Sequence, residues 1–155
     1  MTETLQPPST LSAPSKIDEL ERAIVDSLEL FIPVTEHFFI SGEYIRRIHM
    51  PAGSYLTSKT HATRHPFKVT KWRCIDYDEL GQELQHITAP YCGITEPGTR
   101  RALQIIEDTV WTTYHTNEDD ETDLAVIEGR VIIPHENSLL CDCGIPQIEE
   151  GSDLT

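Results

Sequence analysis

The chain has 155 residues, with 12 lysines and arginines against 26 aspartates and glutamates, which gives a formal net charge of −14. Its hydrophobic share of 38% is below that of an average globular protein and fits one folded domain with polar ends. This negative charge repels phosphate backbones and anionic lipid, so it argues against coating of nucleic acid or a membrane. The sequence has neither a secretory start nor an apolar run of about 18 residues, and we expect a soluble, cytoplasmic protein.

The chain begins with a polar arm and one amphipathic helix. Ser15 and Asp18 have the spacing of a capping box, and apolar residues recur at helical intervals over 16–30 before Pro33. After this helix the pattern changes to β-rich runs, and the last segment is acidic. The predicted segments are a flexible arm (1–14), a helix (15–31), a β domain (32–135) and an acidic tail (136–155).

Many short β-rich runs, separated by Gly, Pro and Asp, fill the predicted β domain. Short strands with turn residues at regular intervals are typical of a sandwich or a barrel. A short helix is expected over 123–128, after an acidic loop. The predicted strands are 38–40, 44–50, 54–60, 67–75, 83–88, 100–106, 110–115 and 130–133.

Two stretches of this region resemble the conserved motifs of cupins. Pro51-Ala52-Gly53 followed by His61 and His65 resembles the first motif, and Glu96-Pro97-Gly98 leading through Arg101 to His115 resembles the second. Residues 38–133 as a whole also resemble small cupin-like proteins of tailed phages. The resemblance implies a mainly β fold, a double-stranded β-helix (jelly-roll) barrel. It further implies a homodimer, because cupin barrels often pair through an edge sheet, and for a phage-encoded protein it implies the host cytoplasm.

The sequence departs from the cupin metal motif at three points. The two histidines are separated by three residues, where the family usually has H-x-H. The glutamate of the motif is replaced in the Val69-Thr70-Lys71 region, and Arg101 stands at the position of the second-motif histidine. Arginine stays protonated and cannot ligate a divalent cation, so the full ligand set of the family is absent.

His61 and His65 remain candidate metal ligands. An interval of four places both on one face of a strand, where Phe67 and Val69 continue the same parity toward the barrel interior. A third inward ligand, for which His115 is the candidate, would complete a site for Zn, Mn, Ni or Fe. The alternative is that the histidines cap loops or form hydrogen bonds at the barrel mouth.

The segment from 100 to 116 is predicted to form a hairpin. A three-residue loop at Glu107-Asp108-Thr109 pairs Ile106 with Val110 and places Arg101 opposite His115, on a face shared with Trp111. A two-residue loop would instead pair Arg101 with Tyr114. An inward Arg101 needs an anionic ligand or an internal carboxylate as partner, whereas an outward one would meet a surface carboxylate.

Two functional hypotheses follow, and the sequence leaves open whether the protein is an enzyme. In the first, a pocket lined by Arg101, His115, Arg46 and Trp111 binds an anionic small molecule, in a binding or accessory role. In the second, His61, His65 and His115 hold the metal of an isomerase, epimerase or dioxygenase. The incomplete metal set favours the first hypothesis. Residues 44–75 also carry seven basic side chains and no acidic one, which would attract an anion.

Overall fold

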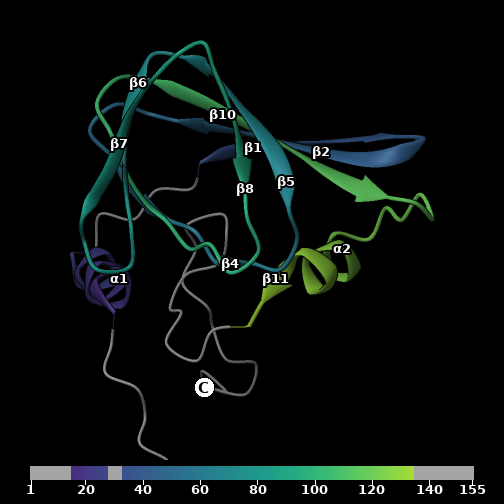
Figure 1. The fold of residues 1–155 in the computed structure, drawn as a ribbon, viewed down its shortest axis with the longest axis horizontal. Helices are drawn as coiled ribbons and strands as arrows, with labels where there is room; N and C mark the ends of the chain where they lie inside the picture. The colour runs from purple at the N-terminus through teal and green to yellow at the C-terminus, as the bar shows by residue number, and fades with distance from the viewer. Residues whose placement is uncertain (1–14, 28–32, 135–155) are drawn as a thin grey trace, which may run out of the picture.

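Antiparallel strands dominate the computed structural model, which describes residues 15–27 and 33–134 (Figure 1). A five-stranded sheet holds, in spatial order, β1 (Val34–Ile40), β2 (Gly42–Met50), β10 (Thr109–Asn117), β5 (His65–Lys71) and β8 (Tyr91–Thr95). A four-stranded sheet holds β3 (Tyr55–Thr57), β9 (Ala102–Ile105), β6 (Arg73–Tyr77) and β7 (Glu83–Thr88). A short sheet pairs β4 (Thr60–His61) with β11 (Ile132–Ile133), and the helices are α1 (Lys16–Asp26) and α2 (Leu124–Val131).

The pairing of the strands is nested. Strand β6 pairs with β7, β5 with β8, β3 with β9, and β2 with β10, so that each pair encloses the previous one along the chain. Successive pairs alternate between the two sheets, as in a long hairpin wound into a barrel. This topology confirms the predicted mainly β fold, a double-stranded β-helix with an N-terminal helix.

The barrel interior is apolar at one end and polar at the other. Along β5 the inward residues are His65, Phe67 and Val69, all buried, as their common parity predicts. Phe67 stacks on Trp111 of β10 with ring centroids 4.3 Å apart. On β10 the inward series passes from Trp111 through Thr113 to His115, so the histidines of both strands lie beyond the apolar core. The core consists of Met50, Phe67, Val69, Cys74, Ile87, Ile105 and Trp111.

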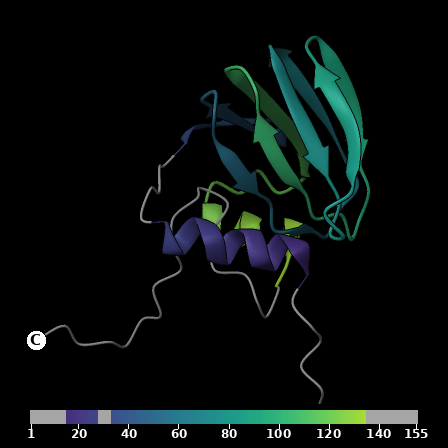
Figure 2. The ribbon, with the colours of Figure 1, turned by 90° about the vertical axis from the view of Figure 1, so that its left-hand side faces the viewer.

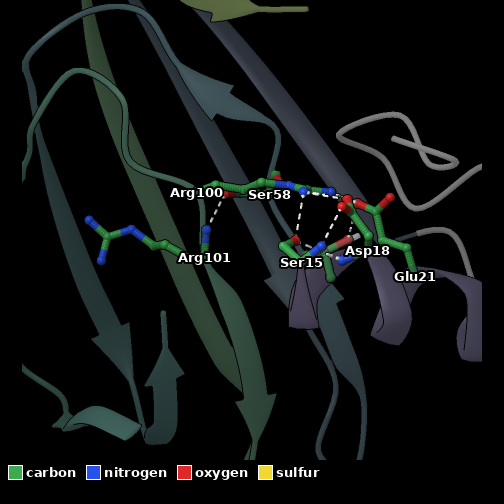
Figure 3. A network of polar contacts seen from close by, with 7 residues as sticks. Ser15, Asp18, Glu21, Ser58, Arg100 and Arg101 are labelled. Atoms are coloured by element: carbon green, nitrogen blue, oxygen red, sulfur yellow. Dashed lines mark hydrogen bonds and ion pairs between the residues drawn. The ribbon is translucent and has the colours of Figure 1, made fainter. Parts of the chain in front are cut away.

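Helix α1 lies at one end of the barrel strands (Figure 2), and a buried arginine attaches it there (Figure 3). The capping box predicted for the start of this helix is present, since Ser15 Oγ accepts from the Asp18 amide and Asp18 accepts from the Ser15 amide. Arg100 Nη1 lies 2.6 Å from Asp18 Oδ1, and Nη2 lies 3.0 Å from Glu21 Oε1. Residues 28–31 of the predicted helix lie outside the described residues. Within the part of the chain that the structure describes, neither helix could span a membrane.

Several predicted strand boundaries are wrong. The predicted strand 67–75 is broken at Trp72, which has a φ of 47° and turns the chain from one sheet into the other. The run 54–60 forms two short strands, β3 and β4, and β8 was not predicted at all. The helix expected at 123–128 begins after Asp123, whose side chain accepts from the Ala125 amide, and it continues to Val131. Of the predicted strand 130–133, only Ile132–Ile133 is a strand.

The predicted hairpin between 100 and 116 is also wrong. Strand β9 pairs with β3 and β6, whereas β10 pairs with β2 and β5 in the other sheet. The amides of Ile106 and Glu107 donate to the Arg73 carbonyl, so the connection follows the corner between the sheets. Arg101 is consequently not the strand partner of His115, because the loop joins sheets and not neighbouring strands.

Candidate functional site

Two adjoining cavities lie at the polar end of the barrel. The inner cavity, of about 70 Å³, is bounded by His65, Thr95, Arg101 and Trp111 among others. The outer cavity, of about 230 Å³, extends from the inner face of β1, β2 and β10 to α2. Arg46, His61 and Thr113 line both cavities and therefore form the passage between them.

Three histidines meet at this passage. The ring centroids of His61 and His65 are 4.8 Å apart, and those of His65 and His115 are 4.3 Å apart. The prediction that His61 and His65 share one strand is wrong, because His61 lies in β4 and His65 begins β5. The two strands approach each other across a bend, so the rings still meet inside the barrel.

The hydrogen bonds of these histidines leave three buried ring nitrogens without a partner. His65 Nδ1 lies 3.0 Å from the Thr63 carbonyl oxygen, which can only accept, so Nδ1 carries the proton. In a neutral ring His65 Nε2 is then a bare acceptor. His65 Nε2, His61 Nδ1 and His115 Nδ1 are all buried and have no hydrogen-bond partner among residues 15–27 and 33–134.

Burial keeps all three imidazoles neutral. It lowers the pKa of His61 and of His115 to about 3, and the neighbouring histidines and arginines act in the same direction. Burial also lowers the pKa of His65, although its hydrogen bond to the Thr63 carbonyl acts in the opposite direction. The cluster therefore provides uncharged rings near pH 7.

Arg101 points into the barrel and meets an internal carboxylate. Its Nη1 lies 2.6 Å from Asp76 Oδ2, and its Nη2 donates to Thr95 Oγ1 over 3.0 Å. The guanidinium also lies 5.1 Å from the ring centroid of Phe67 and 5.7 Å from that of Trp111. The sequence left open whether Arg101 points inward or outward. In the structure it points inward and pairs with an internal carboxylate.

Asp76, the partner of Arg101, is completely buried. Burial raises the pKa of its carboxyl, and the charge of Arg101 opposes that shift. Asp76 follows the buried Cys74 at an interval of two on β6, so strand parity already indicated that it points inward. The sequence analysis did not single it out.

Arg46 lies between the outer and inner cavities. Its strand neighbours are His37 on β1 and Thr113 on β10, and all three side chains face the barrel interior. Its charge contributes to the lowered pKa values of His37, His61 and His115, after the larger effect of burial. Two guanidinium groups, those of Arg46 and Arg101, therefore line the inner cavity beside the histidines.

The walls of the outer cavity differ in polarity. The strand side presents His37, Tyr44 and Arg46, and Tyr44 OH lies 2.7 Å from His37 Nδ1. The opposite side is formed by Leu124, Ile127 and Val131 of α2 together with Ile132. At the rim, the Glu128 carboxylate forms an ion pair with Lys59.

The fit to a metal ion is incomplete. Neutral imidazoles are suitable donors for Zn, Mn, Ni or Fe, and three partnerless nitrogens are available. However, among residues 15–27 and 33–134 no group of three or more His, Cys, Asp or Glu side chains is arranged to hold a metal ion. The charges of Arg46 and Arg101 beside His61 also disfavour a divalent cation.

Comparison with known proteins supports no assignment beyond the fold. No protein-family profile matches the chain, and no curated protein matches it. Solved structures similar to it include a double-stranded β-helix domain protein from Klebsiella pneumoniae (14% identity, covering 58% of this chain and 81% of that one, TM-score 0.48). Others are an RmlC-like cupin from Methanocaldococcus jannaschii (11%, 56% and 81%, 0.47) and an acetylacetone dioxygenase from Acinetobacter johnsonii (15%, 63% and 75%, 0.46).

Proposed function

We propose that the barrel binds a small anionic molecule at the passage between its two cavities. The observation that carries this proposal is the position of Arg46, which lines both cavities beside three neutral histidines. Burial lowers the pKa of His61 most, followed by His65 and then by the cations Arg101 and Arg46. The chain as a whole has a net charge of −14, so a cationic interior is a local feature of this site.

Arg46 and Arg101, which both line the inner cavity, are the two cations that would receive the anion. Arg101 also forms an ion pair with buried Asp76, which holds its guanidinium inside the barrel. Both arginines are among the ligand-binding residues of the sequence-based hypothesis. Trp111 and Arg101 then form the floor of the site, and His115 forms its side.

The cavity volumes restrict the ligand to a small molecule. Ligand pockets commonly have volumes of about 300–1,000 Å³. The outer cavity, at about 230 Å³, lies below that range and leaves room for a short organic acid or a small phosphate ester.

Thermal-shift and calorimetric titrations with panels of small carboxylates and sugar phosphates test the proposal. We expect at least one anion to stabilise the protein and the Arg46→Met variant to lose that stabilisation. Arg47→Met is the matched control, because Arg47 lies on the opposite face of the same strand, over the Phe38 ring. A flat panel, or equal binding by the Arg46 variant, would overturn the proposal.

A metal-dependent activity is the second candidate, supported by the three partnerless imidazole nitrogens. Its test is metal analysis of protein purified without an affinity tag, together with thermal melts after addition of Zn, Mn, Ni or Fe. Bound metal or a raised melting temperature would support it, whereas protein that is metal-free and unaffected by all four ions would eliminate it.

Phage origin, cytoplasmic location, an accessory role and a homodimer remain predictions. Light scattering on the full chain tests the homodimer directly, since a monomer mass at micromolar concentration would contradict it.

A further inference from the structure

Strand β1 leaves one edge of the five-stranded sheet open. It pairs with β2 on one side, and among residues 15–27 and 33–134 no strand pairs with its other side. Alternate residues of such an edge direct their backbone N–H and C=O groups away from the sheet, where a further strand can bind them. Lysine and proline, which commonly protect edge strands from such pairing, are both absent from β1.

The exposed side chains of β1 are mostly apolar. The strand carries four exposed large hydrophobic residues, Val34, Phe38, Phe39 and Ile40. The other edge strands of the two main sheets, β3, β7 and β8, carry one each. Phe38 and Ile40 share one face of β1 and Phe39 lies on the other, because side chains alternate along a strand. A strand added to β1 would therefore find apolar contacts on both faces.

Acidic residues lie beside the end of β1 that turns into β2. The loop after β10 contains four consecutive acidic residues, Glu118, Asp119, Asp120 and Glu121. Asp120 Oδ1 accepts from the amide of Gly42 over 2.7 Å, so this loop is attached to the turn between β1 and β2. Arg130 pairs with Asp119. Four carboxylates against this one guanidinium leave the loop with a net negative charge.

We infer that β1 docks an extended, positively charged segment of another protein, which adds to the sheet as a further strand. The main-chain groups of β1 bind the segment, Phe38, Phe39 and Ile40 contact its apolar side chains, and the acidic loop attracts its cationic residues. The chain's net charge of −14 favours this partner over a second copy at the same edge, because two such chains repel each other. The inference is independent of the proposed anion site.

Three labelled peptides test the inference by fluorescence anisotropy with the full chain. Lys-Lys-Val-Thr-Val-Thr-Val-Lys-Lys has the proposed chemistry, and the second peptide replaces its four lysines by glutamates. The third is the basic peptide with all central residues N-methylated, so that it cannot donate main-chain hydrogen bonds. We expect the basic peptide to bind at least tenfold more tightly than the other two. No binding would overturn the inference, and so would equal binding of the N-methylated peptide, since charge alone would then explain the affinity.

Two matched variants locate the binding surface. Ile40→Thr on β1 and Ile94→Thr on β8 change residues that are 53% and 50% exposed, at opposite edges of the same sheet. We expect Ile40→Thr to weaken binding of the basic peptide about fivefold and Ile94→Thr to change it by less than about twofold. Equal effects of the two variants would contradict a site on β1. A wild-type dimer in light scattering that Ile40→Thr dissociates would also overturn the inference, because a second copy would then occupy the edge.

Discussion

The buried histidines should make the protein sensitive to mild acid. His61 and His115 have pKa values of about 3 in the folded chain, against an ordinary value of 6.5. Between these values the unfolded chain binds protons that the folded chain excludes, so the stability is complete above pH 6.5 and decreases as the pH falls. Each histidine contributes about 1.4 kcal/mol per pH unit in that window.

From pH 6.5 to pH 4.5 the two histidines together should lower the free energy of unfolding by about 5 kcal/mol. His65 acts in the same direction, because burial lowers its pKa as well. The raised pKa of Asp76 acts in the opposite direction, since the folded state then takes up a proton more readily. A loss of this size is comparable with the whole stability of a marginal domain.

Urea unfolding followed by tryptophan fluorescence, with EDTA present, at pH 7.5, 6.5, 5.5 and 4.5 measures this loss. We expect His115→Gln to reduce the slope by about 1.4 kcal/mol per pH unit. A free energy of unfolding that stays constant from pH 7.5 to 4.5, or an unchanged slope in His115→Gln, would refute the reasoning.

Three further predictions concern stability, each measured by urea unfolding at pH 7.5. Arg101→Met leaves the buried Asp76 carboxylate without its ion pair and should lower the free energy of unfolding by about 3–5 kcal/mol. Adding Asp76→Asn should recover part of that loss. A loss below about 1 kcal/mol would contradict this account. Arg100→Met should cost a similar amount, because it removes the buried guanidinium that pairs with Asp18 and Glu21. An unchanged stability would show that α1 is attached by other contacts. Trp72→Asn should stabilise by about 0.5–1 kcal/mol, because asparagine tolerates a positive φ; destabilisation would indicate that the exposed ring packs usefully.

Strand alternation made the fold predictable from the sequence. The parity of Phe67 and Val69 and the capping box at Ser15 are both local patterns, and each is present in the structure. The sheet to which a strand belongs is not determined by the local sequence. The 100–116 segment looks like a hairpin by its spacing, yet its two strands lie in different sheets because other strands compete for their edges.

The candidate site could be predicted only in part for the same reason. The meeting of His61, His65 and His115 follows from the jelly-roll order that the cupin resemblance implied. The partner of Arg101 could not be predicted in this way. Asp76 is 25 residues away in the chain and reaches Arg101 only when β6 packs beside β9. The sequence also did not predict that the side chains of two consecutive arginines point in opposite directions. Arg100 points toward α1, and Arg101 points into the barrel (Figure 3).

The nested strand pairing also limits the routes by which the barrel can assemble. The pair β6 and β7 joins Arg73 to Thr88, whereas β2 and β10 join Gly42 to Asn117, so the loop to be closed lengthens from the innermost pair outward. Closing the inner hairpin first shortens the effective loop for β5 with β8, and each closure prepares the next. We therefore expect slow folding that starts at β6 and β7, with the histidine cluster completed late, when β10 joins β2.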